Sequence, residues 1–326
     1  MNISQIAKMA GVSISAVSRY LNGGYLSKEK KLAIKAVIDE TGYEPFKQAQ
    51  ILRTKKTNVI GVIVPKISSE AISKVVSGIS SVLSERGYLM LLTNTENDTS
   101  KEIQYLKLLN NNPVDGILFV ATMFDARHHK TIKELDVPII IIGQSYRDYP
   151  CVYHDDYTMA KQLTTQMIDS GKKRLGCICV TSKDMAAGYN RTAGFRDALK
   201  EHCLELPEYG VIEADFNMAS GYEKFKILQE KYPEMDGVFC ATDSIAIGAM
   251  ECAKGLGKKI PDELSIAGVG STQMSRVVSP RLTTAYLHYK TSGIEGANII
   301  LEMIEGGARI SKQLKLGHKI TQGETV

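Results

Sequence analysis

Most of the chain, from residue 58 to about residue 305, alternates short apolar runs with amphipathic stretches, and this alternation limits the possible folds. The first four apolar runs are continuous, as in strands that are buried on both faces; they lie at 59–64, 88–93, 114–120 and 138–143. The stretches between them have the apolar spacing of helices; they lie at 71–83, 101–109 and 126–135. This order predicts a doubly wound parallel sheet with helices on both faces.

The same alternation then repeats, which predicts a second sheet domain of the same α/β class. Helices are expected at 157–170, 188–202, 219–231 and 243–255, and strands at 174–180, 210–213, 237–241 and 264–269. The two domains join near 151–156 and 284–290, and a helix at 290–305 returns to the first domain. We therefore expect an N-subdomain at 58–156 and 290–326, a C-subdomain at 157–289, and a ligand cleft at the carboxyl ends of their strands.

Residues 1–45 have the pattern of a helix-turn-helix. One apolar stripe of Ile6, Ala7, Met9 and Ala10 ends at Gly11, and a second begins after Ser13, a predicted N-cap, with Val17, Tyr20 and Leu21. A third helix runs from Ser27 to about Thr41, and its predicted buried residues are Leu32, Ile34, Val37 and Ile38. A helical hairpin inside a protein core is the alternative interpretation.

Charge favours a nucleic-acid partner for this N-terminal part. Residues 1–57 carry ten Lys and Arg against four Asp and Glu, whereas the whole chain of 326 residues has a net charge of only +4. A basic segment on a mildly acidic remainder is typical of a protein that binds the phosphate backbone. In a helix-turn-helix the second helix enters the major groove, and here it presents Ile14, Ser15 and Arg19 outward.

A short hinge helix and linker are predicted at 46–57. Pro45 suits the first turn of a helix, but a helix of about eight residues does not hold together alone in water, so we expect it to fold on DNA. Leu52 would then enter a base step of the minor groove, with Ala49 packed beside it. A plain flexible linker is the alternative.

Other function classes find little support in the sequence. The six cysteines form no CxxC pair, so reduced cysteines in a cytoplasmic protein are expected rather than disulfides or zinc. No apolar run reaches the roughly 18 residues of a membrane span, and no export signal opens the chain. His154, Asp155 and Asp156 lack a second ligand cluster, and phosphate-binding and nucleophile motifs are absent, so we expect no catalysis, metal or cofactor.

Several segments together resemble the LacI/GalR family of bacterial transcriptional regulators. They are IAKMAGVSISAVSRYLN from residue 6, YEPFKQAQILRTKKTNVIGVIVP from 43, NRTAGFRDALK from 190, ATDSIAIGAM from 241, LSIAGVG from 264 and SPRLTTAYLHYK from 279. The resemblance implies a homodimer that binds palindromic double-stranded operator DNA. It also implies a body like a periplasmic sugar-binding protein, in which a small effector changes operator affinity.

The resemblance also implies roles for residues of the N-terminal unit. Ile14 and Ser15 occupy base-reading positions and Arg19 a further one, and two parallel donors suit Arg19 to guanine. A role for Arg19 at phosphate alone remains open. The phosphate-positioning residues would be Ser4, Ser13, Ser18 and Asn22.

In the cleft, the resemblance points to Arg191 as the residue that holds the ligand. The other residues expected around the effector are Ser69, Thr122, Gln144, Asp155, Phe216, Asp243, His288 and Tyr289. Sugar hydroxyls require fixed charged or amide groups, and sugar C–H groups suit an aromatic face. Asp243 could instead be a helix cap and Phe216 a core residue.

Four positions depart from the family pattern. Gly270 replaces a usual ligand-binding Asp, Ala71 and Ile72 replace an aromatic pair, and Phe46 replaces Asn after Pro45. We expect a repressor of carbohydrate-utilisation genes with a saccharide effector. The alternatives are a nucleobase or a phosphorylated co-repressor, a carbohydrate enzyme with a DNA-binding unit, or a sugar-binding receptor.

Overall fold

The computed structural model describes residues 1–43, 56–112, 114–306 and 312–326, in two compact units, 1–57 and 58–326. The predicted hinge helix, including Ala49 and Leu52, lies outside the described residues, as does Phe46.

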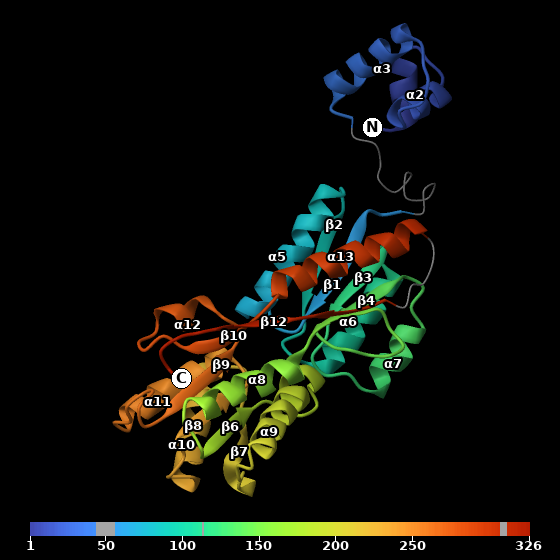
Figure 1. The fold of residues 1–326 in the computed structure, drawn as a ribbon. Coiled ribbons are helices and arrows are strands. Elements are labelled where there is room, and N and C mark those ends of the chain that lie inside the picture. The colour runs from blue at the N-terminus through green and yellow to red at the C-terminus, as the bar shows by residue number, and fades with distance from the viewer. Residues whose placement is uncertain (44–55, 113, 307–311) are drawn as a thin grey trace. The chain divides into compact units, whose positions relative to one another are not determined.

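The described residues of the N-terminal unit contain three helices and have the predicted helix-turn-helix (Figure 1). The helices are α1 (Ile3–Met9), α2 (Ile14–Leu21) and α3 (Lys28–Thr41). Ser13 caps α2 by accepting a hydrogen bond from the Ala16 N–H at 3.2 Å, and Gly42 ends α3 in the left-handed region at φ 60°.

The core of this unit is small, and two predicted core residues lie outside it. Ile6, Val17 and Ile34 are fully buried between the three helices. Met9 is 52% exposed and Leu32 is 59% exposed. A three-helix unit of this size buries only a narrow stripe of each helix, so both residues, although apolar, face solvent.

Unit 58–326 is built on two mostly parallel sheets, as the alternation of strands and helices predicted (Figure 1). In the described residues each sheet has six strands rather than the four expected, because residues 151–154, 283–287, 313–316 and 318–321 also form strands. The first sheet has the strand order β11-β5-β4-β3-β1-β2, and all its pairings are parallel. Its strands are β1 (Val59–Val64), β2 (Leu89–Asn94), β3 (Gly116–Val120), β4 (Ile139–Ile142), β5 (Cys151–His154) and β11 (Gln313–Leu316). Its helices are α5 (Glu70–Glu85), α6 (Thr99–Asn111), α7 (Ala126–Lys133) and α13 (Tyr289–Gly306).

The second sheet has the order β12-β10-β9-β8-β6-β7 and is parallel except for β12, which runs antiparallel to β10. Its strands are β6 (Leu175–Cys179), β7 (Val211–Glu213), β8 (Gly237–Cys240), β9 (Ser265–Val269), β10 (Thr283–Leu287) and β12 (His318–Thr321). Its helices are α8 (Asp156–Asp169), α9 (Arg191–Glu201), α10 (Met218–Lys231), α11 (Asp243–Gly255) and α12 (Gln273–Val277), with a π-helical turn at Met185–Asn190 and a 3₁₀ turn at Glu208–Gly210.

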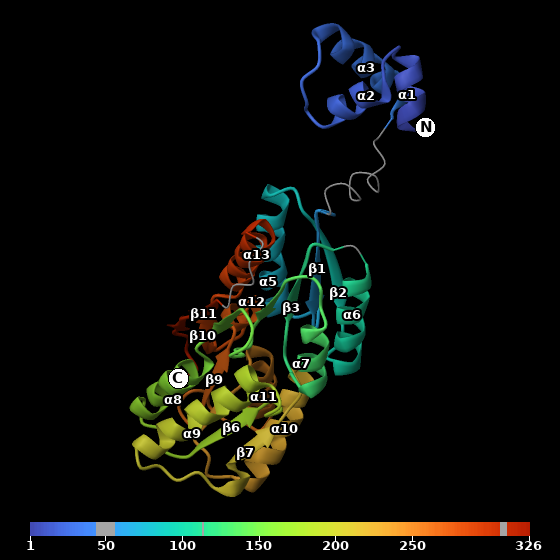
Figure 2. The ribbon, with the colours of Figure 1, turned by 90° about the vertical axis from the view of Figure 1, so that its right-hand side faces the viewer.

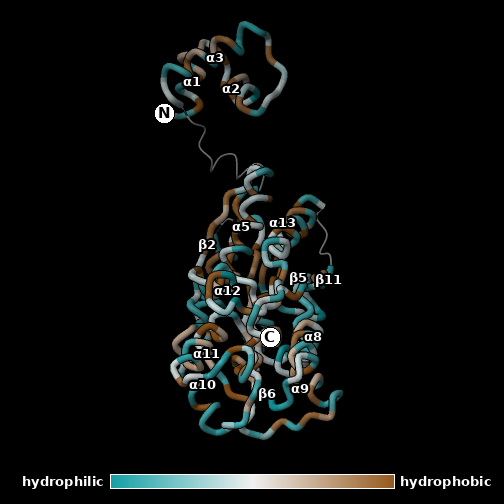
Figure 3. Tube along the Cα trace, turned by 60° about the vertical axis from the view of Figure 1, so that its left-hand side comes forward, coloured by the Kyte–Doolittle hydropathy of each residue, from teal (hydrophilic) through white to brown (hydrophobic). Residues whose placement is uncertain are grey.

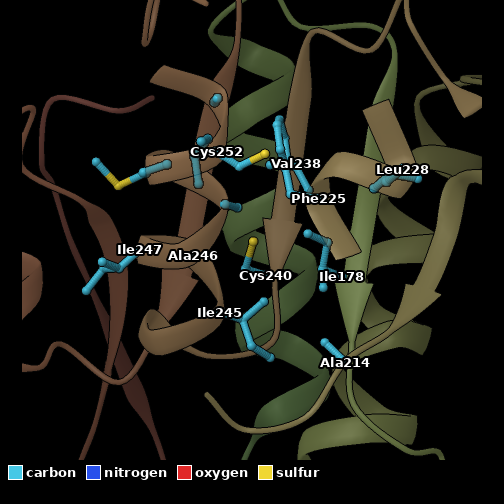
Figure 4. Close-up of a cluster of buried hydrophobic side chains, with 14 of the residues drawn as sticks. Ile178, Ala214, Phe225, Leu228, Val238, Cys240, Ile245, Ala246, Ile247 and Cys252 are labelled. Carbon is cyan, nitrogen blue, oxygen red and sulfur yellow. The ribbon is translucent and has the colours of Figure 1, made fainter. Parts of the chain in front are cut away.

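Helices cover both faces of each sheet. In the first subdomain α5 and α13 lie on one face, and α6 and α7 on the other (Figure 2). In the second, α10 and α11 cover one face and α8 and α9 the other. Figure 4 shows the apolar cluster between α10, α11 and the sheet, with Phe225, Val238 and Ile245 inside it. Figure 3 shows that helices α5 and α13 carry both hydrophobic and hydrophilic residues, as is typical of helices that cover a sheet with one side.

Helices α5 and α13 approach each other closely because glycine lies at their contact. A Cβ atom on Gly78 would lie 2.1 Å from the Lys290 carbonyl oxygen, and one on Gly293 would lie 2.1 Å from the Val75 carbonyl oxygen. Only glycine leaves room for backbone at that separation. The pair fixes the position of α5, which begins at the cleft.

Three connections between the subdomains lie side by side. The chain crosses after β5, after β10 and between β11 and β12. His154 at the end of β5 pairs in register with Leu316 of β11, and Leu287 at the end of β10 pairs with His318 of β12. The chain thus crosses back once more than predicted, and residues 318–321 belong to the second sheet. The expected assignment of all of 290–326 to the first subdomain is wrong for this strand.

Two further observations concern the cysteines and membrane-spanning helices. All six cysteines are free thiols, four of them buried. No helix in the described ranges is long and apolar enough to cross a membrane.

Candidate functional site

Helix α2 of the N-terminal unit presents a polar and cationic surface. Ile14 is 51% exposed, and Ser15 and Arg19 are exposed on the same helix. The Ser13 hydroxyl lies 2.9 Å from that of Ser15, at the N-terminal end of the helix. An exposed helix start with a nearby guanidinium can reach base edges in a major groove.

The other residues predicted to contact DNA flank this surface. Ser4 is exposed on α1 and Ser18 is half-buried on α2. The Asn22 side-chain amide donates a hydrogen bond to the Ser18 carbonyl oxygen just beyond α2. These positions place hydroxyl and amide groups on both sides of Arg19.

A cavity of about 400 Å³ lies between the two subdomains of residues 58–326. Its volume is within the range of roughly 300–1,000 Å³ that small-molecule sites occupy. Seven of the nine residues expected around the effector line it: Ser69, Thr122, Gln144, Arg191, Phe216, Asp243 and Tyr289. They come from the carboxyl ends of strands and the starts of helices, where doubly wound folds bind ligands.

Arg191 is held in place by a buried ion pair. Its Nε donates to Asp156 Oδ1 at 2.7 Å, its Nη1 donates to the Ala241 carbonyl, and both charged side chains are at most 6% exposed. Burial by itself lowers the pKa of Arg191, but the Asp156 carboxylate raises it above its ordinary value. The guanidinium is therefore a fixed cation with a fixed orientation at the cavity wall.

Gln144 joins the two subdomains across the cavity. Its Nε2 donates to the Thr122 carbonyl oxygen at 2.9 Å and to Asp184 Oδ1 at 2.7 Å, and its Oε1 accepts from the Ala186 N–H at 3.2 Å. Asp184 also caps the π-helical turn before α9. Burial raises the pKa of Asp184, while the bonds from Ala187 and Gln144 oppose this rise.

Asp243 is the first residue of α11, whose cap is Thr242. Its Oδ2 accepts from the Thr272 N–H at 2.8 Å and from the Thr272 hydroxyl at 2.9 Å, and its Oδ1 accepts from the Thr284 hydroxyl. Burial raises the pKa of Asp243 against these bonds. Asp243 therefore ties the segment after β9, which contains Gly270 at φ 137°, to α11.

Phe216 both lines the cavity and packs against the core cluster between α10 and α11. Ala71 and Ile72, which replace the aromatic pair of the family, line the opposite part of the wall on α5. The cavity thus combines an apolar wall with buried polar groups.

The structure places Asp155 and His288 outside the residues that line the cavity. Asp155 caps α8 and pairs with Lys315 Nζ at 2.9 Å. His288 packs its ring edge against Tyr286, with 5.0 Å between ring centroids. Successive residues of an extended segment point to opposite sides, so residues next to Asp155 and His288 in the chain face the cavity instead.

Those neighbours are His154 and Asp156, which the sequence interpretation did not assign to the cleft. Both line the cavity, together with Asp184 and Glu70. The triplet His154-Asp155-Asp156 is recognisable in the sequence as a cluster of titratable residues. The residue at which β5 ends determines which of the three point into the cavity. The Asp156 partner Arg191 lies 35 residues away, beyond the reach of local patterns.

An exposed helix-turn-helix and a cavity of ligand size in one chain define a class: a DNA-binding regulator that senses a small molecule. Residues 2–45 match the family model for "Bacterial regulatory proteins, lacI family". Residues 57–323 match the family model for "Periplasmic binding proteins and sugar binding domain of LacI family". The chain belongs to the lacI family of bacterial transcription regulators.

Individual relatives agree with this assignment. The chain is 33% identical to a sucrose operon repressor of Staphylococcus xylosus, over 93% of this chain and 94% of that protein. It is 29% identical to a ribose operon repressor of Halalkalibacterium halodurans, over 99% and 96%. A structure of the lac repressor dimer bound to operator matches with a TM-score of 0.90 at 20% identity, over 100% of this chain and 98% of that one. These relatives are regulators of transcription rather than enzymes.

Proposed function

We propose that this protein represses genes for carbohydrate utilisation and that a small saccharide in the cleft controls its hold on operator DNA. The observation that carries the proposal is the cavity itself, where a buried ion pair, an amide bridge and an aromatic side chain meet. This combination suits a ligand with many hydroxyl groups and an apolar ring face. The similarity to repressors of a sucrose operon and a ribose operon supports the same ligand class.

On DNA, we propose that α2 lies in the major groove. Arg19 would contact a guanine, and Ile14 and Ser15 would face the neighbouring bases. The phosphate contacts would come from Ser4, Ser13, Ser18 and Asn22. Leu52 and Ala49, which lie outside the described residues, would contact the minor groove.

Control would depend on the angle between the subdomains. Besides the Gln144 bridge, the Gln273 N–H donates to both carboxylate oxygens of Glu70, at 3.0 and 3.2 Å, and Lys74 Nζ donates to the Ser271 carbonyl at 3.4 Å. A saccharide that bound one subdomain angle better than the other would shift the operator-binding equilibrium. A thousandfold change in operator affinity requires about 4 kcal/mol of differential binding.

A second copy of the chain is the proposed protein partner. Edge strand β2 exposes Leu89 and Leu91, and α12 exposes Met274, beside the 72% exposed Val277. Clusters of exposed apolar side chains on an edge strand are typical of interfaces. A dimer would present two α2 helices to a palindromic operator in the cytoplasm.

The test combines DNA selection with a ligand screen. Genomic fragments would be selected with the full chain, and their binding would be measured by fluorescence anisotropy with and without a panel of mono- and disaccharides. The proposal predicts a preferred fragment whose affinity changes with one saccharide. Fragment-independent binding, unaffected by every sugar, would contradict it.

A further inference from the structure

The cavity contains a histidine that the proposed switch does not use. His154 ends β5, is 7% exposed and lines the cavity. Its ring meets the Tyr289 ring edge to face, with 5.2 Å between centroids. Among the described residues its Nε2 is fully buried and has no hydrogen-bond partner.

The hydrogen bonding of His154 determines what this nitrogen can do. The backbone of His288 favours a hydrogen on this ring. Because Nε2 has no partner, we assign that hydrogen to Nδ1. Burial lowers the pKa of His154, which favours the neutral ring. Nε2 is then a buried acceptor without a donor, an arrangement that costs free energy until a ligand supplies one.

A second unpartnered polar atom lies at the same edge of the first sheet. Thr122 follows β3 and lines the cavity, and its buried Oγ1 has no hydrogen-bond partner in the described part of the chain. Strand β4 lies between β3 and β5, so the two atoms come from the carboxyl ends of strands that are one strand apart in the same sheet. A hydroxyl can donate or accept, and the two atoms therefore suit a ligand that carries several O–H groups.

The charges around the cavity disfavour an anionic ligand. Among the described lining residues, the acidic side chains outnumber the basic ones by four to two: Glu70, Asp156, Asp184 and Asp243 against Lys66 and Arg191. Arg191 already bonds Asp156 and Ala241, and Lys66 is only half-buried. A phosphate group has acceptor oxygens and negative charge, so it would meet carboxylates and the acceptor nitrogen of His154.

We infer that the ligand of this cleft is an uncharged polyol, without a phosphate group, and that one of its hydroxyl groups donates a hydrogen bond to Nε2 of His154. This inference rests on the proposed function, because it assumes that the cleft holds the effector. It excludes the phosphorylated co-repressor that the sequence left open.

The first experiment measures binding of matched pairs to the full chain by isothermal titration calorimetry. The probes are glucose, fructose, ribose and sucrose, each compared with its phosphate ester. At least one uncharged sugar is expected to bind at least about tenfold more tightly than its ester. An ester that bound as tightly as its parent sugar and changed operator affinity would overturn the inference but leave the proposed regulation intact. If neither class bound while operator binding persisted, both proposals would fail.

The second experiment tests His154 with the sugar that binds. His154→Ala should weaken binding at least about tenfold, and His154→Gln should restore part of the loss, because an amide oxygen is again an acceptor. His202→Gln, on an exposed histidine outside the cavity, is the matched control. Thermal unfolding of each variant separates loss of fold from loss of binding. Unchanged affinity in a folded His154→Ala variant would overturn the role of His154.

The pH dependence of saccharide affinity is a measurement that a purely structural role of His154 would not change. Protonation of Nε2 turns the acceptor into a donor, so wild-type affinity should fall as pH drops from about 7 to about 5. The groups that face His154 are Asp156, Arg191, Tyr289 and His288. Because all four are retained in His154→Gln, its profile should lose this fall, and an identical profile in both proteins would contradict the inference.

Discussion

Arg191 and Asp156 form an ion pair with 2.7 Å between Nε and Oδ1, and neither side chain is more than 6% exposed. One end of this pair belongs to the start of α9 and the other to the start of α8, directly after the chain enters the second subdomain. The pair therefore connects the wall of the cavity to the crossover.

The first prediction concerns stability. Arg191→Ala leaves the Asp156 carboxylate buried without its partner, which should lower the free energy of unfolding by about 3–5 kcal/mol, measured by urea denaturation. Adding Asp156→Leu to the same chain should recover part of the loss, because no unpaired charge remains. A single variant that lost less than about 1 kcal/mol would show that the pair is not tightly coupled.

The second prediction separates charge from geometry at the same residue. Arg191→Lys keeps the cation but cannot bond Asp156 and Ala241 with one planar group. We expect a folded protein that binds operator and no longer changes its affinity when the saccharide is added. A normal ligand response, measured by anisotropy on the same operator, would show that the proposed role of Arg191 is incorrect.

The third prediction concerns base reading by α2. Arg19→Ala should reduce discrimination between operator and random DNA by about 1–3 kcal/mol, because the bidentate contact to guanine is lost. Competition binding at one fixed salt concentration measures this difference. Equal weakening on both DNAs would assign Arg19 to phosphate instead.

The fourth prediction concerns closure of the cleft. Burial by itself raises the pKa of Glu70, but hydrogen bonds from Lys74 and from the Gln273 N–H lower it below the usual value. The contribution of the Glu70 carboxylate to folding stability is thus complete above pH about 4.5, the ordinary pKa of the group. It is lost as pH falls through the lower pKa of the folded state. Glu70→Ala should speed hydrogen exchange of the Gln273 amide by at least about fivefold at neutral pH. Glu85→Ala, on an exposed residue of the same helix, is the control, and equal exchange in both variants would refute the link.

The fifth prediction tests the contact between α5 and α13. Gly78→Ala would place a methyl group against the Lys290 carbonyl, and overpacking of this kind costs about 1–3 kcal/mol. Gly306→Ala is the matched control, because among the described residues no other part of the chain comes within 4 Å of its added Cβ. Similar melting temperatures for the two variants would contradict the close approach.

The two sheets were predictable because buried parallel strands leave continuous apolar runs such as Val59–Val64. Strands β11 and β12 were not, because they lie at sheet edges, where residues such as Lys315 and Lys319 alternate with apolar ones. Their pairing depends on strands more than 30 residues distant in the chain. Local patterns therefore predict the layers but not the last crossing.

The cavity was predictable to within one residue at its crossovers. Arg191 lies in a recognisable motif and Gln144 follows a predicted strand, whereas the exchange of Asp155 for Asp156 depends on the residue at which β5 ends. The acceptor of His154 was not predictable at all, since its unpartnered nitrogen results from burial of the ring against Tyr289. Hydrogen-bond satisfaction is a property of the assembled site.

The side-by-side passage of β5, β10 and the β11–β12 turn also limits how the two halves can move. Adjacent backbone links oppose sliding and twisting but permit bending about the line that joins them. A bound metabolite can thus change one angle and little else. Molecules of different shape that reach the same angle would give the same output, so a synthetic agonist need imitate only the degree of opening, not the natural compound.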